Sequence, residues 1–314
     1  MSKPWLQIAV GVLRCENEIC LSLRQKHQSH ADCWEFPGGK IEANESVEEA
    51  LKREFIEELG IETDEWQPLI EIPWSYEKIN VRLHVYQTYE FTGTPSGQEG
   101  QEVKWFDCSE LRTLTFPEAN RGILTALELG DRYMITGSFQ GEDDFKRRLQ
   151  SGLDKGASLC QLRLKDADNA QRLEWAQLAM PILQAAGAKL LINGSAAMFA
   201  LCPSVDGLHL SSRQLFEYSE RPIAENKLLG VSVHNQVEVE QALTIGADFI
   251  LLSPVQPTQT HPDMAALGWE AFAEMVSQIP VPVFALGGMT QADLAQAKAC
   301  GAQGIAAISD FWGR

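Results

Sequence analysis

The sequence predicts an α/β protein of two domains: a mixed β-sheet between helices (an α/β/α sandwich), followed by a (βα)8 barrel. Three observations predict this architecture. The chain has 314 residues, long enough for two domains. A helical stretch over residues 119–129 ends at Gly130 and Asp131. Beyond it, short apolar strands alternate with amphipathic helices, which is the pattern of βα units. We therefore expect domains at residues 1–130 and 131–314.

In the first domain we expect strands and one well-marked helix. The strands are expected near residues 6–13, 18–24, 69–75, 81–91 and 102–106. Ser46 followed three residues later by Glu49 forms a capping box, which opens a helix, and Gly60 supplies its end. The apolar side chains of this helix share one broad arc: Val47, Ala50, Leu51, Phe55 and Leu59.

Glu54, Glu57 and Glu58 stand at positions i, i+3 and i+4 of this helix, directly after the glycine-rich loop 37–39. Glu54 falls inside the apolar arc, and the other two lie close beside it. The ordinary interpretation of a glutamate-rich helix is a solvated face with ion pairs. Ionised carboxylates on a core-facing side, however, repel one another and are costly to desolvate without a compensating cation or arginine. Arg53 can compensate part of the charge, whereas Mg²⁺ carrying a phosphate chain explains all three carboxylates.

The stretch from residue 39 to residue 61 resembles the Nudix box, G-x5-E-x7-R-E-U-x-E-E-x-G-U. Every fixed position is matched: Gly39, Glu45, Arg53, Glu54, Glu57, Glu58 and Gly60. The apolar positions hold Phe55 and Ile61, and Phe55 is aromatic where an aliphatic residue is usual. The resemblance implies Mg²⁺-dependent hydrolysis of a nucleoside diphosphate linked to another group, with Mn²⁺ able to replace Mg²⁺.

The Nudix resemblance also implies a role for each matched side chain. The implied metal ligands are the Gly39 carbonyl and the carboxylates of Glu54, Glu57 and Glu58. Arg53 and Glu45 would orient these carboxylates. A glutamate left without metal would accept a proton from the attacking water.

Within the Nudix family, residues 5–128 are similar to the MutT-type 8-oxo-dGTP diphosphatases. The similarity includes the first strand and residues 35–42, which place Phe36 in the substrate-binding region. Arg24 lies where this branch has an arginine near the nucleotide; the alternative is an ordinary exposed arginine. Glu99 stands where the branch has a further metal-associated glutamate; the alternative is a solvated acid in a loop.

Residues 116–120 resemble the MutT segment whose asparagine recognises the oxidised purine, and Asn120 occupies that position. An amide side chain has both a donor and an acceptor, which suits the edge of a purine. The resemblance therefore implies that Asn120 binds the 8-oxoguanine base. The alternative is that Asn120 caps the helix beginning near Arg121.

Composition narrows the class of partner. The formal net charge of −17 argues against a nucleic-acid polymer, whereas a nucleotide that arrives with Mg²⁺ can bind an acidic metal site. The seven cysteines are odd in number and include no C-x-x-C pair, which indicates reduced thiols rather than disulfides or zinc. No signal peptide and no membrane-spanning apolar run is visible, so we expect a soluble, cytoplasmic protein with no membrane partner.

Eight short apolar stretches in the second half predict the strands of a small barrel: residues 132–136, 159–164, 189–192, 207–210, 228–233, 249–252, 282–286 and 304–308. Barrel chemistry belongs at the C-terminal ends of strands, which here carry Lys165, Asn193, His209, His234, Ser253, Gly287, Gly288 and Ser309. Two histidines and a Gly-Gly turn suit a small phosphorylated ligand. We expect the N–H groups of Gly287, Gly288 and Ser309 to bind phosphate; the alternative is that the glycines serve tight packing alone.

The second half resembles the thiamine phosphate synthase and TenI superfamily over nearly its full length. The segments that carry the resemblance are residues 161–165, 206–210, 230–234 and 286–290. Thiamine phosphate synthases use two aspartates for Mg²⁺-pyrophosphate and have a lysine in a nearby loop. Those positions hold Gly194, Gln214 and His261 here. Without the carboxylates the pyrophosphate-metal chemistry has no ligands, so we expect no synthase activity.

TenI, a thiazole tautomerase, shares the Asn-Gly pair, and its catalytic histidine lies in a Ser-Val-His segment that His234 matches. Moving a proton on a thiazole needs only a positioned acid-base group, and imidazole titrates in the right range. The alternative is that His234 caps a strand in a domain kept for binding or stability. His209 is expected to be structural, and the ligand implied for the barrel is a thiazole phosphate or a related small phosphorylated compound.

The sequence thus predicts hydrolysis of 8-oxo-dGTP to 8-oxo-dGMP and pyrophosphate, which removes a mutagenic precursor from the nucleotide pool, beside a TenI-like barrel. Two alternatives stay open. The Nudix substrate could be a thiamine-related pyrophosphate, and the barrel could be a catalytically silent binding or regulatory module. Barrels of this family are often oligomeric, so we expect a homodimer.

Overall fold

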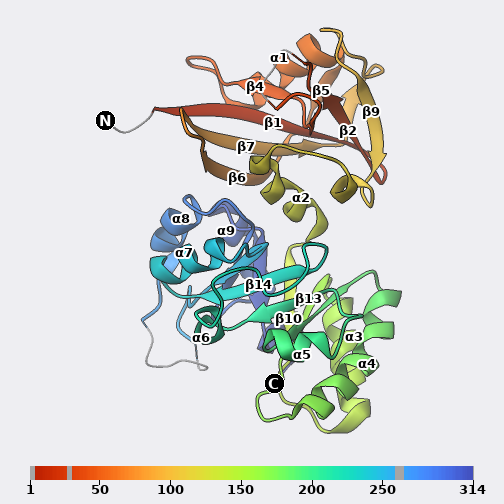
Figure 1. Ribbon diagram of the computed structural model, residues 1–314, viewed down its shortest axis with the longest axis vertical. Coiled ribbons are helices and arrows are strands. Elements are labelled where there is room, and N and C mark those ends of the chain that lie inside the picture. Colours follow the sequence, from red (N-terminus) through yellow and green to blue (C-terminus); the bar gives the residue numbers. More distant parts are fainter. Residues whose placement is uncertain (1–3, 27–29, 259–264, 314) are drawn as a thin grey trace. The chain divides into compact units, whose positions relative to one another are not determined.

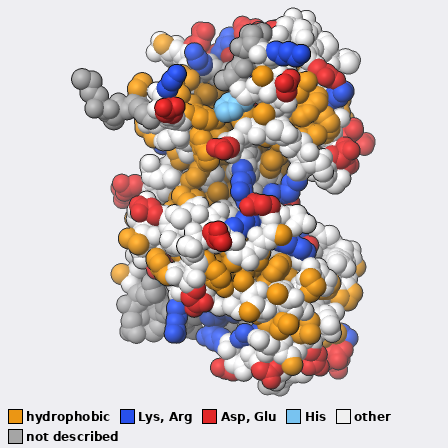
Figure 2. Space-filling view, in the orientation of Figure 1, with side chains coloured by type: hydrophobic (Ala, Val, Ile, Leu, Met, Phe, Trp, Pro, Cys, Tyr) orange, Lys and Arg blue, Asp and Glu red, His pale blue; other side chains and the backbone are white. Residues whose placement is uncertain are grey.

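The computed structural model describes residues 4–26, 30–258 and 265–313. The chain separates into two compact units, Met1–Glu128 and Leu129–Arg314 (Figure 1). No helix in the described ranges is both long and apolar enough to span a bilayer. On the face drawn in Figure 2, acidic, basic and apolar side chains are interspersed over each unit.

The first unit is built on a seven-stranded mixed sheet with the strand order β3-β2-β1-β7-β6, in which β4 also pairs with β1 and β9 with β2. The strands are β1 (Trp5–Cys15), β2 (Glu18–Leu23), β3 (Trp34–Glu35), β4 (Gly38–Lys40), β6 (Gln67–Ser75), β7 (Asn80–Thr88) and β9 (Val103–Asp107). Strands β1 and β7 run parallel, and the other pairs are antiparallel. A separate ribbon pairs β5 (Glu62–Asp64) with β8 (Glu90–Thr92).

The five strands expected in this unit are present as β1, β2, β6, β7 and β9, whereas β3, β4, β5 and β8 were missed. The missed strands have two or three residues each, too few to show a hydrophobic period. The strand expected over residues 81–91 ends at Thr88. The Thr88 hydroxyl donates to the Asp64 carbonyl and accepts from the Glu90 N–H. These two bonds stabilise the bend between β7 and β8.

Two helices cover opposite faces of the sheet: α1 (Val47–Leu59) and α2 (Arg121–Glu128). Successive side chains of a strand point to opposite faces. In β1, Ala9 belongs to the same core cluster as Phe55 of α1, whereas Val10 belongs to that of Ile123 in α2. The expected α/β/α sandwich is therefore confirmed.

The unusual Phe55 of the Nudix box is accommodated by Gly11 of β1. A Cβ atom at Gly11 would lie 2.4 Å from Cε2 of Phe55 and 2.8 Å from the ring of Trp66. The two rings pack edge to face with centroids 5.0 Å apart. A missing side chain in the sheet thus makes room for an aromatic residue in the helix.

The second unit is a closed barrel of parallel strands in sequence order, in which β17 pairs with β10. The strands are β10 (Arg132–Ile135), β11 (Leu159–Leu162), β12 (Lys189–Asn193), β13 (Gly207–Leu210), β14 (Leu228–Val233), β15 (Phe249–Leu252), β16 (Val283–Leu286) and β17 (Gly304–Ala307). The helices are α3 (Gly141–Asp154), α4 (Asn169–Ala185), α5 (Ala196–Ala200), α6 (Ser212–Leu215), α7 (Gln236–Thr244), α8 (Gly268–Val276), α9 (Leu294–Ala299) and α10 (Ser309–Trp312). The expected eight-stranded barrel is confirmed.

Most of the barrel core lies between the strands and the surrounding helices, and a smaller apolar cluster fills the interior. That interior cluster includes Tyr133, Phe249 and Phe284, whose rings meet edge to face. The buried polar side chains of this unit include Gln161 and His209, on strands β11 and β13. A polar group buried in this way requires hydrogen-bond partners.

Candidate functional site

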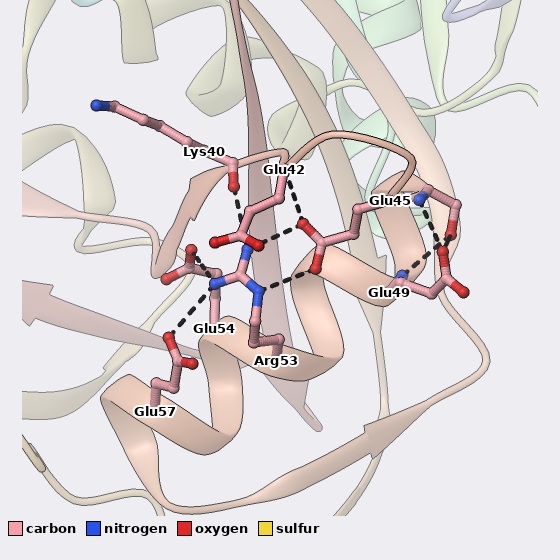
Figure 3. A network of polar contacts seen from close by, with 8 residues as sticks. Lys40, Glu42, Glu45, Glu49, Arg53, Glu54 and Glu57 are labelled. Carbon is pink, nitrogen blue, oxygen red and sulfur yellow. Dashed lines mark hydrogen bonds and ion pairs between the residues drawn. The ribbon is translucent and has the colours of Figure 1, made fainter.

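Arg53 is the centre of the polar network in the Nudix box (Figure 3). Its Nε and Nη2 donate to the two carboxylate oxygens of Glu45, at 2.9 and 3.0 Å. Its Nη1 donates to Glu54 at 2.7 Å and to Glu57 at 3.3 Å, and Nη2 also donates to the Lys40 carbonyl at 3.1 Å. A bidentate guanidinium contact fixes the plane of a carboxylate. Arg53 and Glu45 therefore lie where they can orient Glu54 and Glu57.

Gly39 leaves the space that Glu54 occupies. A Cβ atom at Gly39 would lie 2.0 Å from Oε1 of Glu54, far inside contact distance. The neighbouring Gly38 has φ of +147°, and its own Cβ atom would lie 2.2 Å from the Ala9 carbonyl oxygen. Strand β4 and helix α1 thus approach so closely that the Gly39 backbone and the Glu54 carboxylate lie side by side.

Glu58 carries a mostly buried carboxylate close to other acids. Its Oε2 accepts from the Gly38 N–H at 3.3 Å. Burial, and then the negative charges of Glu54, Glu35 and Glu99, raise the pKa of Glu58 to about 8.

The loop that carries Glu99 is fixed to the C-terminal end of α1. The Glu58 carbonyl accepts from the N–H of Gln98 at 2.9 Å and from the side chain of Gln101 at 3.0 Å. Gly60 admits this loop, because a Cβ atom there would lie 2.8 Å from Nε2 of Gln98. The loop thereby lies against the helix end that bears Glu58, although the Glu99 residue itself is exposed.

The donor set fits a hard divalent cation. Carboxylate and carbonyl oxygens are the ligands that Mg²⁺ takes, and a cation would relieve the repulsion that raises the pKa of Glu58. In the described ranges, no three His, Cys, Asp or Glu side chains already converge as metal ligands. Arg53 instead contacts Glu54 and Glu57 directly. Glu57 also differs from the expectation of a core-facing residue, since its side chain is 56% exposed.

The raised pKa of Glu58 predicts how stability depends on pH without metal. The folded state holds the Glu58 proton more tightly than the unfolded chain, so stability is full below about pH 4.5 and falls as the pH rises towards 8. In EDTA, the calorimetric transition of the first unit is expected to move to lower temperature across this window, and Mg²⁺ should offset the loss at pH 8.

Glu58→Gln should flatten this profile, because it removes the titrating group. Glu62→Gln, at an exposed position in β5, is the matched control and should keep the wild-type profile. An unchanged profile in Glu58→Gln would mean that another group causes the dependence.

Aromatic side chains and Asn120 form the other part of the candidate nucleotide site. The rings of Phe36 and Phe116 are stacked, with centroids 5.5 Å apart. The Trp34 N–H donates to the Thr115 carbonyl at 2.8 Å, which holds the segment leading to Asn120 along β3.

Asn120 itself is 8% exposed and ends the short 3-10 helix η2 (Glu118–Asn120). Among the described residues its side-chain amide makes no hydrogen bond, and therefore no helix-cap bond.

Arg24 forms an ion pair with Glu35, and both side chains are largely buried. Burial raises the pKa of the Glu35 carboxyl, and Arg24 offsets part of that effect. Arg24 is therefore not an ordinary exposed arginine. Glu35 was not expected as a site residue, although its charge acts on Glu58. In the sequence, only its position two residues before Pro37 of the glycine-rich loop indicated that it lies near the site.

His234 follows β14 at the C-terminal end of the barrel. Its Nδ1 lies 2.8 Å from the Ser253 carbonyl oxygen, and its backbone N–H donates to the Glu238 carboxylate at 2.7 Å. A carbonyl oxygen only accepts, so Nδ1 carries a proton. In the neutral ring, Nε2 is then an unprotonated base. Within the described ranges, no hydrogen bond engages Nε2.

Gly287 and Gly288 adopt φ of +95° and +72°, and Cβ atoms there would lie 2.8 Å from Cα of Pro254 and 2.9 Å from Cβ of Gln256. Backbone conformation and packing thus require glycine at both positions. Ser309 is exposed as the first residue of α10. A phosphate at these N–H groups stays a prediction.

The two positions that lack the synthase aspartates are structurally ordinary. A Cβ atom at Gly194 would meet only Met198, at 3.4 Å. Gln214 completes the capping box of α6 with Ser211. His261, the third substituted position, lies outside the described residues.

Arg163 was not expected as a site residue. It follows β11 in the chain, is half-buried, and forms no ion pair or side-chain hydrogen bond among the described residues. Burial lowers the pKa of its guanidinium, and its positive charge acts on His209. Gln161, Arg163 and Lys165 stand two residues apart along the chain. In an extended strand this spacing places polar side chains on one face, and it is the signal in the sequence that would have indicated Arg163. An unpaired, half-buried cation suits an anionic ligand.

Both halves match known families. The family model of the NUDIX domain matches residues 9–126. The family model of thiamine monophosphate synthase matches residues 132–311. The first half is 37% identical over 128 residues to an 8-oxo-dGTP diphosphatase of Haemophilus influenzae, covering 40% of this chain and 94% of that protein.

The second half is 34% identical over 162 residues to a thiamine-phosphate synthase of Chloroflexus aurantiacus, covering 51% of this chain and 74% of that protein. It is also 31% identical over 178 residues to a thiamine-phosphate synthase of Methanobrevibacter smithii, and this match covers 56% of this chain and 85% of that protein. The chain therefore belongs to two families at once, joining a MutT-like Nudix domain to a barrel of the thiamine monophosphate synthase and TenI family.

Proposed function

We propose that the first unit is a Mg²⁺-dependent diphosphohydrolase that cleaves 8-oxo-dGTP to 8-oxo-dGMP and pyrophosphate and so keeps a mutagenic precursor out of DNA. The observation that carries the proposal is Asn120. The residue is 8% exposed, its side-chain amide makes no hydrogen bond within the described part of the chain, and it ends the segment that holds the stacked Phe116. An amide that no described side chain engages leaves its donor and its acceptor available to the edge of a purine. The similarity to a protein named 8-oxo-dGTP diphosphatase supports the same choice.

The chain's own residues supply orientation, negative charge and a base. The residues that would hold Mg²⁺ are Gly39, Glu54, Glu57, Glu58 and Glu99. The bound cation would neutralise charge that develops on the phosphate oxygens. Arg53 keeps Glu54 and Glu57 in place. A glutamate of this set that the cation leaves free would accept the proton of the attacking water, and Glu58 is a candidate for this role because Arg53 does not hold it.

The proposal is tested by pyrophosphate release with Mg²⁺, comparing kcat/KM for 8-oxo-dGTP, dGTP and thiamine pyrophosphate. A strong preference for 8-oxo-dGTP is expected. Faster hydrolysis of thiamine pyrophosphate would still support Nudix hydrolysis, but it would make a thiamine-related pyrophosphate the substrate.

Asn120→Ala is expected to lower the preference for 8-oxo-dGTP over dGTP by about ten- to a hundredfold, since one or two hydrogen bonds to the base are lost. Hydrolysis of dGTP should change much less, because the metal-binding glutamates are untouched. Steady-state kinetics with both nucleotides measure the ratio.

Asn17→Ala is the matched control, since the Asn17 amide bonds to Asp107 at the surface. An unchanged ratio in Asn120→Ala would show that this amide does not recognise the base, and would favour the thiamine-related substrate.

For the barrel we propose a small phosphorylated ligand, with His234 as an acid-base group. The supporting observations are the proton on Nδ1 that the Ser253 carbonyl requires and the unpaired guanidinium of Arg163. This ligand needs no metal, because Gly194 and Gln214 replace the aspartates of the synthases.

His234→Gln is expected to reduce thiazole phosphate tautomerisation by about 10²–10⁴-fold while leaving binding of the thiazole phosphate within a fewfold. Proton exchange followed by NMR and titration calorimetry give the two values. Binding without any turnover in the wild type would favour the alternative of a silent binding module.

A further inference from the structure

Two glutamine side chains hold the main chain of Glu99. The Glu99 N–H donates to Oε1 of Gln101 at 2.9 Å, and the Glu99 carbonyl accepts from Nε2 of Gln25 at 2.8 Å. Both main-chain polar groups of Glu99 are thus engaged by side-chain amides. Among the described residues, no hydrogen bond or ion pair engages the carboxylate of Glu99. The backbone of this residue is therefore fixed, while its carboxylate is left to other partners.

The amide of Gln101 also joins the loop to helix α1. Its Nε2 donates to the Glu58 carbonyl at 3.0 Å, while its Oε1 accepts from Glu99. The last carbonyls of a helix have no partner within the helix. In α1 the loop supplies such partners, since the Leu59 carbonyl also accepts from the Ser96 N–H at 3.0 Å. One amide therefore links the main chains of two acidic residues of the proposed metal site.

Gln25 reaches Glu99 because the loop runs beside the end of β2. Strands β2 and β9 pair antiparallel, and at the end of this ladder the Leu23 N–H donates to the Glu102 carbonyl at 2.8 Å. Two residues further along the chain, the half-buried Gln25 lies opposite the loop. The position of Glu99 thus depends on the sheet as well as on the helix.

Two glycines allow the loop to turn tightly around Glu99. Gly100 adopts φ of +83°, and its N–H donates to the Gly97 carbonyl at 3.3 Å. A Cβ atom at Gly97 would lie 1.9 Å from the carbonyl oxygen of Gln101. Glu99 therefore stands in a tight turn whose two ends meet.

The charge of Glu99 acts on the acids of α1. Burial first, and then nearby negative charges that include that of Glu99, raise the pKa of Glu58. A cation that relieves this repulsion would attract both carboxylates. A ligand residue whose backbone is already fixed loses less conformational entropy when it binds, so the two glutamine amides should favour binding of the cation.

We propose that Gln25 and Gln101 are positioning residues that hold Glu99 as a ligand of the divalent cation, so that affinity for the cation depends on their amide groups. The inference rests on the proposed function of the first unit, which requires the cation. It adds that two neutral side chains, acting on the main chain of Glu99, contribute to the affinity for the metal.

The test is direct binding of Mn²⁺ to the full chain without nucleotide, measured by the loss of the EPR signal of free Mn²⁺. Gln101→Met keeps the length of the side chain and removes its donor and its acceptor. It is expected to weaken the Kd for Mn²⁺ about tenfold. Gln98→Met is the matched control in the same loop, because the Gln98 amide bonds to Ser96, and it should bind Mn²⁺ like the wild type.

Gln25→Met tests the same role from the other side of the loop. It removes the bond to the Glu99 carbonyl and leaves Gln101 in place, so we expect the Kd for Mn²⁺ to weaken about three- to fivefold. Circular dichroism checks that each variant is folded. This second variant decides the question if Gln101→Met does not fold.

A double variant separates positioning of Glu99 from general stabilisation of the loop. Glu99→Gln removes the ligand carboxylate and should itself weaken binding of Mn²⁺. If Gln101 acts through Glu99, adding Gln101→Met to Glu99→Gln should not weaken binding further. Additive losses would mean that Gln101 affects the site only through the fold, and they would overturn the inference.

The outcomes also separate this inference from the proposed function. Binding of Mn²⁺ at wild-type strength in both Gln101→Met and Gln25→Met overturns the inference and leaves the proposed hydrolase standing. Weakened binding in these variants, together with a wild type that hydrolyses no nucleotide, supports the positioning role and removes the proposed activity. Failure of the wild type to bind Mn²⁺ overturns the metal site and, with it, the role of both glutamines.

Discussion

Glu58→Gln is expected to lower kcat for nucleotide hydrolysis by about 10²–10⁴-fold, because Glu58 belongs to the proposed metal site and is also a candidate proton acceptor. The substitution keeps the size of the side chain and removes both a negative charge and a proton acceptor. The mostly buried carboxylate of Glu58, surrounded by Glu54, Glu35 and Glu99, is the group that a cation would relieve most. Pyrophosphate release at saturating Mg²⁺ measures the loss.

Folding should survive this change, because a neutral amide removes like-charge repulsion at a mostly buried position. Circular dichroism and the calorimetric transition of the first unit check this. Glu57→Gln is also expected to lose activity, since Glu57 belongs to the proposed metal site. Near-normal turnover in either folded variant would refute the metal assignment.

Gly39→Ala is expected to lower kcat/KM by about 10²-fold, because the added methyl group would lie 2.0 Å from Oε1 of Glu54 and must displace that carboxylate. A shift of about 1 Å in a catalytic group is enough for such a loss. The displacement would also disturb the 2.7 Å contact between Arg53 and Glu54. The same pyrophosphate assay applies, with Mg²⁺ titrated to detect weaker metal binding.

Gly194→Ala is the matched control, because the same methyl group meets only an ordinary 3.4 Å contact there, in the other unit. It should leave hydrolysis unchanged. If Gly39→Ala kept full activity with an intact fold, the close approach of β4 to α1 would not be what positions Glu54.

Sequence alone was sufficient for the features that depend on local patterns. The capping box of Ser46 and Glu49 was predicted and is present, as is the Gly60 end of α1. The eight barrel strands were recognisable because each is a short apolar run buried on both sides. The Nudix box was recognisable because its side chains stand at fixed spacings on one helix.

Other features depended on contacts between residues far apart in the chain. Gly11 and Phe55 are separated by many residues, and only packing of β1 against α1 shows that one makes room for the other. The exposure of Glu57 depends on how α1 lies on the sheet, which a helical period does not fix. Of the four short strands of the first unit, β3 and β4 pair with longer strands, and β5 and β8 pair with each other across 25 or more residues of sequence.

The sequence by itself thus determined the two-domain α/β class, the helix with its glutamates and the barrel, because helix period, capping and strand alternation are local properties. Only the tertiary structure decided which acids surround Glu58, that Asn120 makes no cap bond, and that the buried His209 ring lies within hydrogen-bonding distance of the Tyr133 and Ser232 hydroxyls. The physical reason is that burial and charge depend on neighbours brought together by folding, and these set each pKa and each hydrogen-bond partner.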